Sequence, residues 1–169
     1  DEAIMADQTF VIYKMEVTAA HGKPVIVPLK QWRHDLPAMA DAITDRTRLL
    51  MICHLVNITG QILPVKKIVD MAHDKGVAVM VDGAHAFAQL QFTIPELGCD
   101  YYGASLHKWL GCPLGAGILY VKQDRIADLA REQRMDFARR HGVKAVPGSL
   151  ETHGLLGVAI GRHIKVLTS

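Results

Sequence analysis

The residues best suited to chemistry lie in the segment 105–111, of sequence SLHKWLG, which places one lysine beside a hydroxyl and an imidazole. Upstream, the apolar run 77–81 ends abruptly at Asp82. A lysine amine can form a Schiff base with an aldehyde, and a carboxylate can hold a pyridinium nitrogen. Pyridoxal phosphate requires these two groups of a protein, so Lys108 and Asp82 together predict a site for that cofactor.

Three polar positions each follow an apolar run with the length of a buried strand. Asn57 follows 49–56, Asp82 follows 77–81, and the segment 105–111 closes the run that begins at Tyr101. In open α/β sheets, ligands bind outside the carboxyl ends of the strands. We therefore expect one site built from three neighbouring strand ends.

The chemistry of the cofactor assigns a role to each polar group. Asp82 would keep the pyridine nitrogen protonated, because a nearby negative charge favours the charged form. Lys108 would form the Schiff base and then act as the base that moves the α-proton of the substrate. The other groups are expected to bind the cofactor, with Ser105 and His107 donating to the phosphate and Asn57 and His85 bonding the phenolic oxygen.

Each of these residues also has an ordinary structural explanation. An aspartate at a strand end is more often a helix cap or a turn former, and a lone lysine is usually a solvated surface residue. A single histidine is more often a partly buried structural residue. The joint pattern favours the cofactor site, because separate structural explanations would have to hold at three successive strand ends.

The surrounding sequence alternates between strand and helix patterns. The segment 9–20 fits either a helix or a strand, and Asp35 is a suitable N-cap for the helix that follows it. The pattern predicts strands at 25–27, 49–56, 77–81, 101–105 and 117–121, and helices at 36–43, 64–75 and 124–139. This alternation predicts an α/β fold with a mostly parallel sheet and helices on both faces.

Composition excludes several classes of function. The 169 residues are half apolar and carry 19 basic against 17 acidic side chains, which argues against a nucleic-acid surface. The apolar runs are far shorter than the roughly 20 residues of a membrane helix, so no membrane partner is expected.

Three scattered cysteines favour neither a disulfide framework nor a metal site, and the cytoplasm is the expected location. The first residues resemble mid-protein sequence, so a lost leader peptide stays an alternative.

Two other patterns in the sequence do not predict a site. Gly111, Gly115 and Gly117 suggest a nucleotide loop, but they lead into a strand and not into the helix start that a dinucleotide fingerprint needs. The nine histidines include no pair of the His-x-x-x-His type with a carboxylate, so no metal is expected.

At these motifs the chain resembles the class V aminotransferase family of pyridoxal-phosphate enzymes, which has the aspartate-aminotransferase fold type. It is most similar to the isopenicillin-N-epimerase-like and cysteine-desulfurase-like branch. The resemblance runs from about Asp7 to Arg125 and rests on the segments 54–64 (HLVNITGQILP), 81–86 (VDGAHA) and 105–111.

The resemblance implies the same roles for the residues above and adds two more. Phe10 lies near the position that stacks on the cofactor ring in the family, and Thr152 lies in a segment resembling the one that reaches the phosphate of the partner subunit. His85 stands where many members carry glutamine. The resemblance also implies a homodimer and an amino-acid or keto-acid substrate.

Family members are roughly twice this length or more, so the chain resembles a part of a longer enzyme or an internally shortened product. We expect residues 1–147 to form the cofactor-binding large domain, incomplete at its N-terminus, and residues 148–169 to lead toward a small C-terminal domain. An aminotransferase-type reaction at the α-amino group is the leading expectation. Epimerisation, cysteine desulfuration or C–S lysis, a catalytically silent assembly module and a nucleotide-binding domain are the alternatives.

Overall fold

A computed structural model describes residues 1–127 and 164–167, the latter by their backbone alone. Seven strands of these residues form one sheet in the order β2-β1-β3-β4-β5-β6-β7. Their bounds are Glu2–Ala6 (β1), Lys23–Val27 (β2), Thr47–Cys53 (β3), Ala78–Asp82 (β4), Tyr101–Ser105 (β5), Gly117–Val121 (β6) and Ile164–Leu167 (β7). The first five strands are parallel, β6 is antiparallel to β5, and β7 is parallel to β6. The expected mostly parallel sheet is confirmed.

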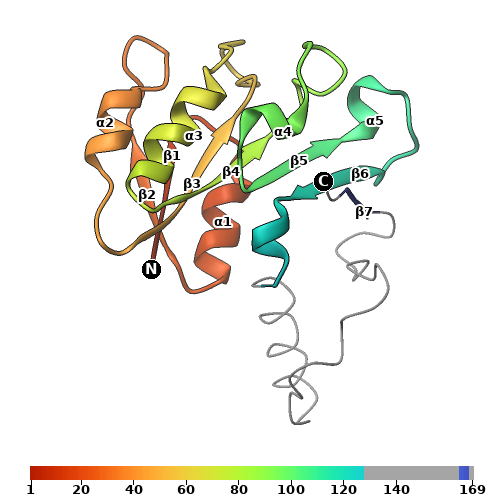
Figure 1. Cartoon of the computed structure of the whole chain (residues 1–169). Helices are drawn as coiled ribbons and strands as arrows, with labels where there is room; N and C mark the ends of the chain where they lie inside the picture. Colours follow the sequence, from red (N-terminus) through yellow and green to blue (C-terminus); the bar gives the residue numbers. More distant parts are fainter. Residues whose placement is uncertain (128–163, 168–169) are drawn as a thin grey trace.

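Helices connect the parallel strands. Their bounds are Ile12–Ala19 (α1), Leu36–Asp41 (α2), Val65–Asp74 (α3), Ile94–Leu97 (α4) and Leu106–Trp109 (α5), followed by a 3₁₀ turn at Gln123–Arg125 (η1). Figure 1 shows α2, α3 and α4 side by side along the sheet, and α3 contacts both of its neighbours. The connection from β1 to β2 runs in the opposite direction to those from β2 to β3 and from β3 to β4. Right-handed crossovers therefore put α1 on the other face of the sheet.

The central strands are apolar on both sides because helices cover both faces. Ile4 in β1, Leu50 and Ile52 in β3, and Val79 and Val81 in β4 have no exposed surface. Full burial of each such side chain contributes about 1.5–3 kcal/mol of transfer free energy. These strands are the rigid part of the molecule that carries the residues at their carboxyl ends.

Local sequence explains where the helices begin and end. The side chain of Asp35 accepts a hydrogen bond from the backbone nitrogen of Ala38 at 3.1 Å, so Asp35 caps α2 as expected. In α3, Val65, Ile68, Val69 and Ala72 form one buried stripe at helical spacing.

The buried carboxylate of Asp100 joins β4, α3 and η1 near the amino-terminal ends of the parallel strands. Asp100 has no exposed surface and accepts hydrogen bonds from the backbone nitrogen of Val79 (2.8 Å) and Nε of Arg125 (2.8 Å), and it bonds Nε2 of His73 (2.8 Å). Burial by itself raises the pKa of Asp100, but the bonds from His73, Val79 and Arg125 outweigh it and lower the pKa. Asp100 directly precedes β5 and does not follow the end of a strand, unlike the expected site residues.

Most expected elements are confirmed, one open alternative is decided, one strand has different bounds, and one helix stays a prediction. The segment 9–20, which fits helix and strand alike, forms the helix α1. The strand expected at 49–56 ends at Cys53. Beyond it the chain turns back on itself, and the backbone nitrogen of Leu63 donates a hydrogen bond to the backbone oxygen of His54. Beyond η1, the helix expected at 124–139 lies largely outside the described residues, as does the boundary expected at 147/148.

Two negative findings apply to residues 1–127 and 164–167. No helix there is both long and apolar enough to span a membrane. No group of three His, Cys, Asp or Glu side chains in that part of the chain could hold a metal ion.

Candidate functional site

The carboxyl ends of the parallel strands meet at one edge of the sheet, beside a reversal of strand order. β1 lies between β2 and β3, so the chain leaves β1 in one direction and later passes it in the other (Figure 1). Such a reversal opens a crevice in which α/β proteins bind ligands. The start of α1, the loop after β3 and the end of β4 surround this point.

Asp82 is the last residue of β4 and is held by both of its carboxylate oxygens. Oδ1 accepts a hydrogen bond from the backbone nitrogen of Ala84 at 2.8 Å, and Oδ2 accepts a short one from the hydroxyl of Tyr13. Cys53 is paired with Asp82 in the β3–β4 register, and its Sγ lies 3.3 Å from the Tyr13 oxygen. Residues of α1 and of the turn after β4 therefore hold the carboxylate directly, and Cys53 of β3 contacts it through Tyr13.

Lys108 and His85 are brought together from segments 23 residues apart. Nζ of Lys108, in α5, lies 3.3 Å from Nε2 of His85, in the turn after β4. The ring of Trp109 packs edge-on to His85 with 6.0 Å between ring centroids. Burial, together with the positive charge of Lys108, lowers the pKa of His85, while the charge of Asp82 opposes this shift. His85 is therefore neutral at neutral pH, and its Nε2, in the tautomer that carries the proton on Nδ1, can accept a hydrogen bond from the lysine amine.

Ser105 and His107 have hydrogen-bonding capacity that the described residues do not use. Ser105 is the N-cap residue of α5, but its side chain makes no cap hydrogen bond. Nδ1 of His107 is buried and has no hydrogen-bond partner among the described residues. Both residues lie within three positions of Lys108 in the sequence, at the carboxyl end of β5.

The other expected site residues make no described contact with Asp82 or Lys108. Asn57 is exposed in the loop after β3, with no hydrogen bond to the site residues described above. Phe10 is half-exposed just before α1, and its ring centroid lies 6.1 Å from that of Tyr13. Thr152 lies outside the described residues.

Sequence reasoning missed Tyr13 and Cys53. Tyr13 is buried with 8 % of its surface exposed, and Cys53 with 3 %. The helical spacing of Phe10, Tyr13 and Val17 was the available signal for Tyr13, since it places Tyr13 and Val17 on one face of the helix. Nothing in the sequence indicates that this face lies against Asp82.

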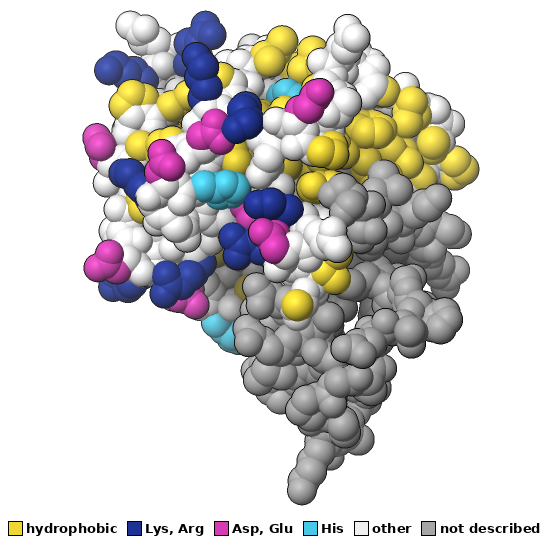
Figure 2. All heavy atoms as spheres, in the orientation of Figure 1, with side chains coloured by type: hydrophobic (Ala, Val, Ile, Leu, Met, Phe, Trp, Pro, Cys, Tyr) yellow, Lys and Arg dark blue, Asp and Glu magenta, His cyan; other side chains and the backbone are white. Residues whose placement is uncertain are grey.

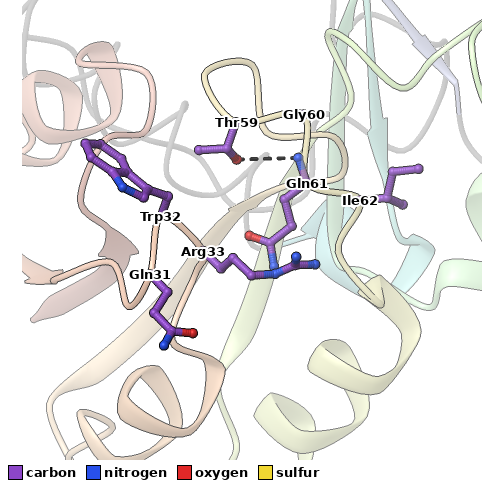
Figure 3. Close-up of a pocket in the computed structure, with 7 residues that line it drawn as sticks. All are labelled: Gln31, Trp32, Arg33, Thr59, Gly60, Gln61 and Ile62. Atoms are coloured by element: carbon purple, nitrogen blue, oxygen red, sulfur yellow. Dashed lines mark hydrogen bonds between the residues drawn. The ribbon is translucent and has the colours of Figure 1, made fainter.

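A separate cavity of about 490 Å³ lies between the loops that follow β2 and β3 (Figure 3). The first loop is a two-residue hairpin in which Lys30 and Arg33 exchange backbone hydrogen bonds of 2.9 and 3.0 Å. The lining residues are Gln31, Trp32, Arg33, Thr59, Gly60, Gln61 and Ile62. None of the expected site residues lines this cavity, so we base the site on the contacts of Asp82 and Lys108.

Hydrophobic side chains are exposed beside Lys108. Trp109, Leu110 and Leu114 have 48, 51 and 88 % of their surface exposed. Figure 2 shows hydrophobic side chains gathered on the side of the molecule where Figure 1 places α5, whereas charged residues of both signs cover α2 and α3. Exposed apolar surface of this kind often marks an interaction site.

The fold and the site together define an α/β protein with a lysine, a neutral histidine and a fixed carboxylate at the carboxyl edge of its sheet. The family model described as aminotransferase class-V matches residues 11–135. The chain belongs to this family.

Known proteins similar to the chain are longer. Isopenicillin N epimerase of Streptomyces clavuligerus is 38 % identical over 96 residues, which are 57 % of this chain and 24 % of that protein. A cysteine desulfurase of Cronobacter sakazakii is 43 % identical over 89 residues, covering 53 % of this chain and 21 % of that protein. The chain thus spans about a quarter of the length of the curated relatives it matches.

Solved structures show the same fold. The cysteine desulfurase CsdA of Escherichia coli superposes with a TM-score of 0.65 at 31 % identity, covering 73 % of this chain and 32 % of that chain. A mutant of C-DES with glycine covalently linked to its PLP cofactor superposes with a TM-score of 0.67 at 27 % identity, covering 75 % and 36 %.

Proposed function

We propose that the chain is the cofactor-binding part of a pyridoxal-phosphate-dependent enzyme that acts at the α-amino group and α-carbon of an amino acid, with an aminotransferase-type reaction. One observation carries the proposal: the amine of Lys108 lies 3.3 Å from a neutral histidine, at the sheet edge that also presents the carboxylate of Asp82. Membership of the class-V family and the PLP cofactor of the C-DES structure support it.

The residues present fit this cofactor. Its aldehyde needs an accessible amine, and Lys108 is exposed. Its phosphate needs donors, and the buried Nδ1 of His107 and the hydroxyl of Ser105 are not bonded within the described residues. Its pyridine nitrogen needs a fixed carboxylate, which Asp82 supplies.

Each residue then has a defined task. When bound, the cofactor withdraws electrons from the α-carbon of the amino acid. Lys108 would hold the cofactor through its amine, and the same amine would remove and return the α-proton of the substrate. His85 would accept a hydrogen bond from the lysine amine and so orient it. Asp82 holds a proton on the ring nitrogen by its negative charge.

Epimerisation at the α-carbon is the second candidate. It needs a proton to be removed and returned without transfer of the amino group, and His85 beside Lys108 is a second proton carrier. The similarity to isopenicillin N epimerase supports this candidate, and the similarity to cysteine desulfurases supports desulfuration in the same way. A catalytically silent module would bind the cofactor and turn nothing over.

The test uses protein expressed from the complete reading frame and loaded with pyridoxal phosphate. We expect a visible absorbance band that a Lys108→Ala variant lacks. A panel of amino acids in deuterated water then separates the reactions. Keto-acid formation with an acceptor indicates transamination, deuterium at the α-carbon with inverted configuration indicates epimerisation, and sulfide from cysteine indicates desulfuration. Protein that stays colourless with added cofactor contradicts the proposal.

The homodimer and the cytoplasmic location expected from the sequence stay predictions. The exposed side chains of Trp109, Leu110 and Leu114 support an interface with a second copy beside the site. We expect no nucleic-acid or membrane partner, and a small amino acid or keto acid as substrate.

A further inference from the structure

Tyr13 is buried in the first turn of α1 and reaches the end of the sheet. Its hydroxyl contacts two residues that are paired across neighbouring strands, Asp82 at the end of β4 and Cys53 at the end of β3. The ring of Phe10 packs edge-on against Tyr13 at an interplanar angle of 83°. The phenol therefore has little freedom to turn away from the carboxylate.

The chemistry of the three groups fixes the direction of the hydrogen bonds. An ionised carboxylate only accepts, so the Tyr13 hydroxyl donates to Asp82. Burial, and next the charge of Asp82, raises the pKa of Tyr13, which keeps this hydroxyl protonated. Burial raises the pKa of the Cys53 thiol to about 11, so Cys53 stays a thiol and can donate to the Tyr13 oxygen. The donors form a chain from Cys53 through Tyr13 to Asp82.

We propose that Tyr13 is a positioning residue that orients the Asp82 carboxylate toward the pyridine nitrogen of the cofactor. This inference rests on the proposed function. Ala84 holds Oδ1 through its backbone nitrogen at 2.8 Å, and Tyr13 holds Oδ2. Two donors on different oxygens prevent rotation of the carboxylate and leave the remaining lone pairs for the ring nitrogen. A hydrogen bond to a charged group is among the strong ones in proteins.

The other titratable groups that face Asp82 cannot replace Tyr13 in this role. His85 and Tyr102 interact with the charge of Asp82, but neither donates a hydrogen bond to it in the described structure. The hydroxyl of Tyr102, on β5, is buried without a hydrogen-bond partner among the described residues. Cys53 reaches Asp82 only through Tyr13.

The test compares Tyr13→Phe with the parent protein, both expressed from the complete reading frame. The substitution keeps the ring and removes the hydroxyl. We expect the dissociation constant for pyridoxal phosphate to rise about tenfold, within what one hydrogen bond to a charged group can supply. We also expect the pH midpoint of the visible band to move upward. A less firmly held Asp82 would stabilise the protonated ring nitrogen less well. An unprotonated ring would withdraw fewer electrons and would leave the Lys108 nitrogen more basic, which raises the midpoint.

Tyr102→Phe is the matched control, because it removes a buried hydroxyl that makes no hydrogen bond to Asp82. We expect the parent dissociation constant and pH midpoint in this variant. If Tyr13→Phe lowers only the thermal unfolding midpoint and leaves both cofactor readouts at the parent values, Tyr13 is structural and the inference is wrong. If the parent protein itself takes up no cofactor, the proposed function fails instead, so the two failures are distinguishable.

Discussion

Lys108 and His85 are two basic groups whose nitrogen atoms, Nζ and Nε2, lie 3.3 Å apart. A protonated imidazole could not accept from the lysine amine and would repel it. Burial and the lysine charge lower the pKa of His85, so the ring is neutral where the lysine needs an acceptor. Glutamine, which the family resemblance places at this position in many members, can accept a hydrogen bond without titrating.

Replacing His85 with glutamine is predicted to remove one acid limb from the pH profile of cofactor binding. In the parent protein the imidazole gains a proton only below its ordinary pKa of 6.5, because its pKa is lowered. Binding of pyridoxal phosphate should weaken there as pH falls. In His85→Gln this weakening should be absent, as measured by spectroscopic titration at several pH values.

The exposed His21, replaced by asparagine, is the control for His85→Gln and should keep the parent profile. Asparagine suits this position because the backbone of His21 has a φ of 60°. An unchanged acid limb in His85→Gln would contradict the role given to this histidine.

At the scale of the elements, the sequence predicts the buried strands and the site at their carboxyl ends. The apolar runs before Asp82 and Lys108 are long enough to indicate buried strands, and polar residues directly after such strands indicate a site. The tight turn after Asp82 also depends on local sequence. A Cβ atom on Gly83 would overlap the ring of Tyr102, so only glycine lets the turn after β4 lie this close to that ring.

Other features could not be predicted, because they depend on contacts between distant segments. Tyr13 lies 69 residues before Asp82, and its sequence neighbours fit a strand as well as a helix. The strand β1 was not expected, because no recognisable turn or cap precedes it in the sequence. The antiparallel direction of β6 follows from the pairing of Ser105 with Gly117, which no local pattern indicates.

The loop after β3 should make the fold sensitive to acid. His54 in this loop is 7 % exposed and packs edge-on against Phe92 with 4.6 Å between ring centroids, and burial lowers its pKa. His54 therefore binds a proton more tightly in the unfolded chain than in the folded protein. The free energy of unfolding therefore falls as pH drops from about 6.5 toward the lower pKa of the folded protein.

Replacing His54 with phenylalanine keeps a ring and removes the titrating group. We expect a smaller difference in unfolding free energy between about pH 7 and about pH 5 than in the parent protein, measured by urea denaturation. A pH dependence as steep as the parent's would show that His54 does not contribute, and would leave the buried His34, whose pKa burial also lowers, as the remaining source in this region.

At the scale of the whole molecule, the reversal of strand order beside β1 brings the separate segments to one edge. Tyr13 follows β1, Cys53 ends β3, Asp82 ends β4 and Lys108 follows β5, and these four strands are consecutive in the sheet. The same edge exposes apolar side chains around α5. A fold of this topology presents a ligand site and an adjoining apolar surface together.

The predicted homodimer can be tested at that surface. Leu114 has 88 % of its surface exposed, and Leu114→Glu should weaken self-association about tenfold or more in analytical ultracentrifugation. Met15, exposed on α1, is the matched control, and Met15→Glu should leave association unchanged. A parent protein that stays monomeric would contradict the prediction.

The central claim is that Lys108 carries the cofactor, and reductive trapping tests it most directly. Protein from the complete reading frame is incubated with pyridoxal phosphate, reduced with borohydride, digested and analysed by mass spectrometry. The account predicts a pyridoxyl group on the peptide that contains Lys108, and its loss in Lys108→Arg. A pyridoxyl group spread over several surface lysines, or an equal yield in Lys108→Arg, would contradict it.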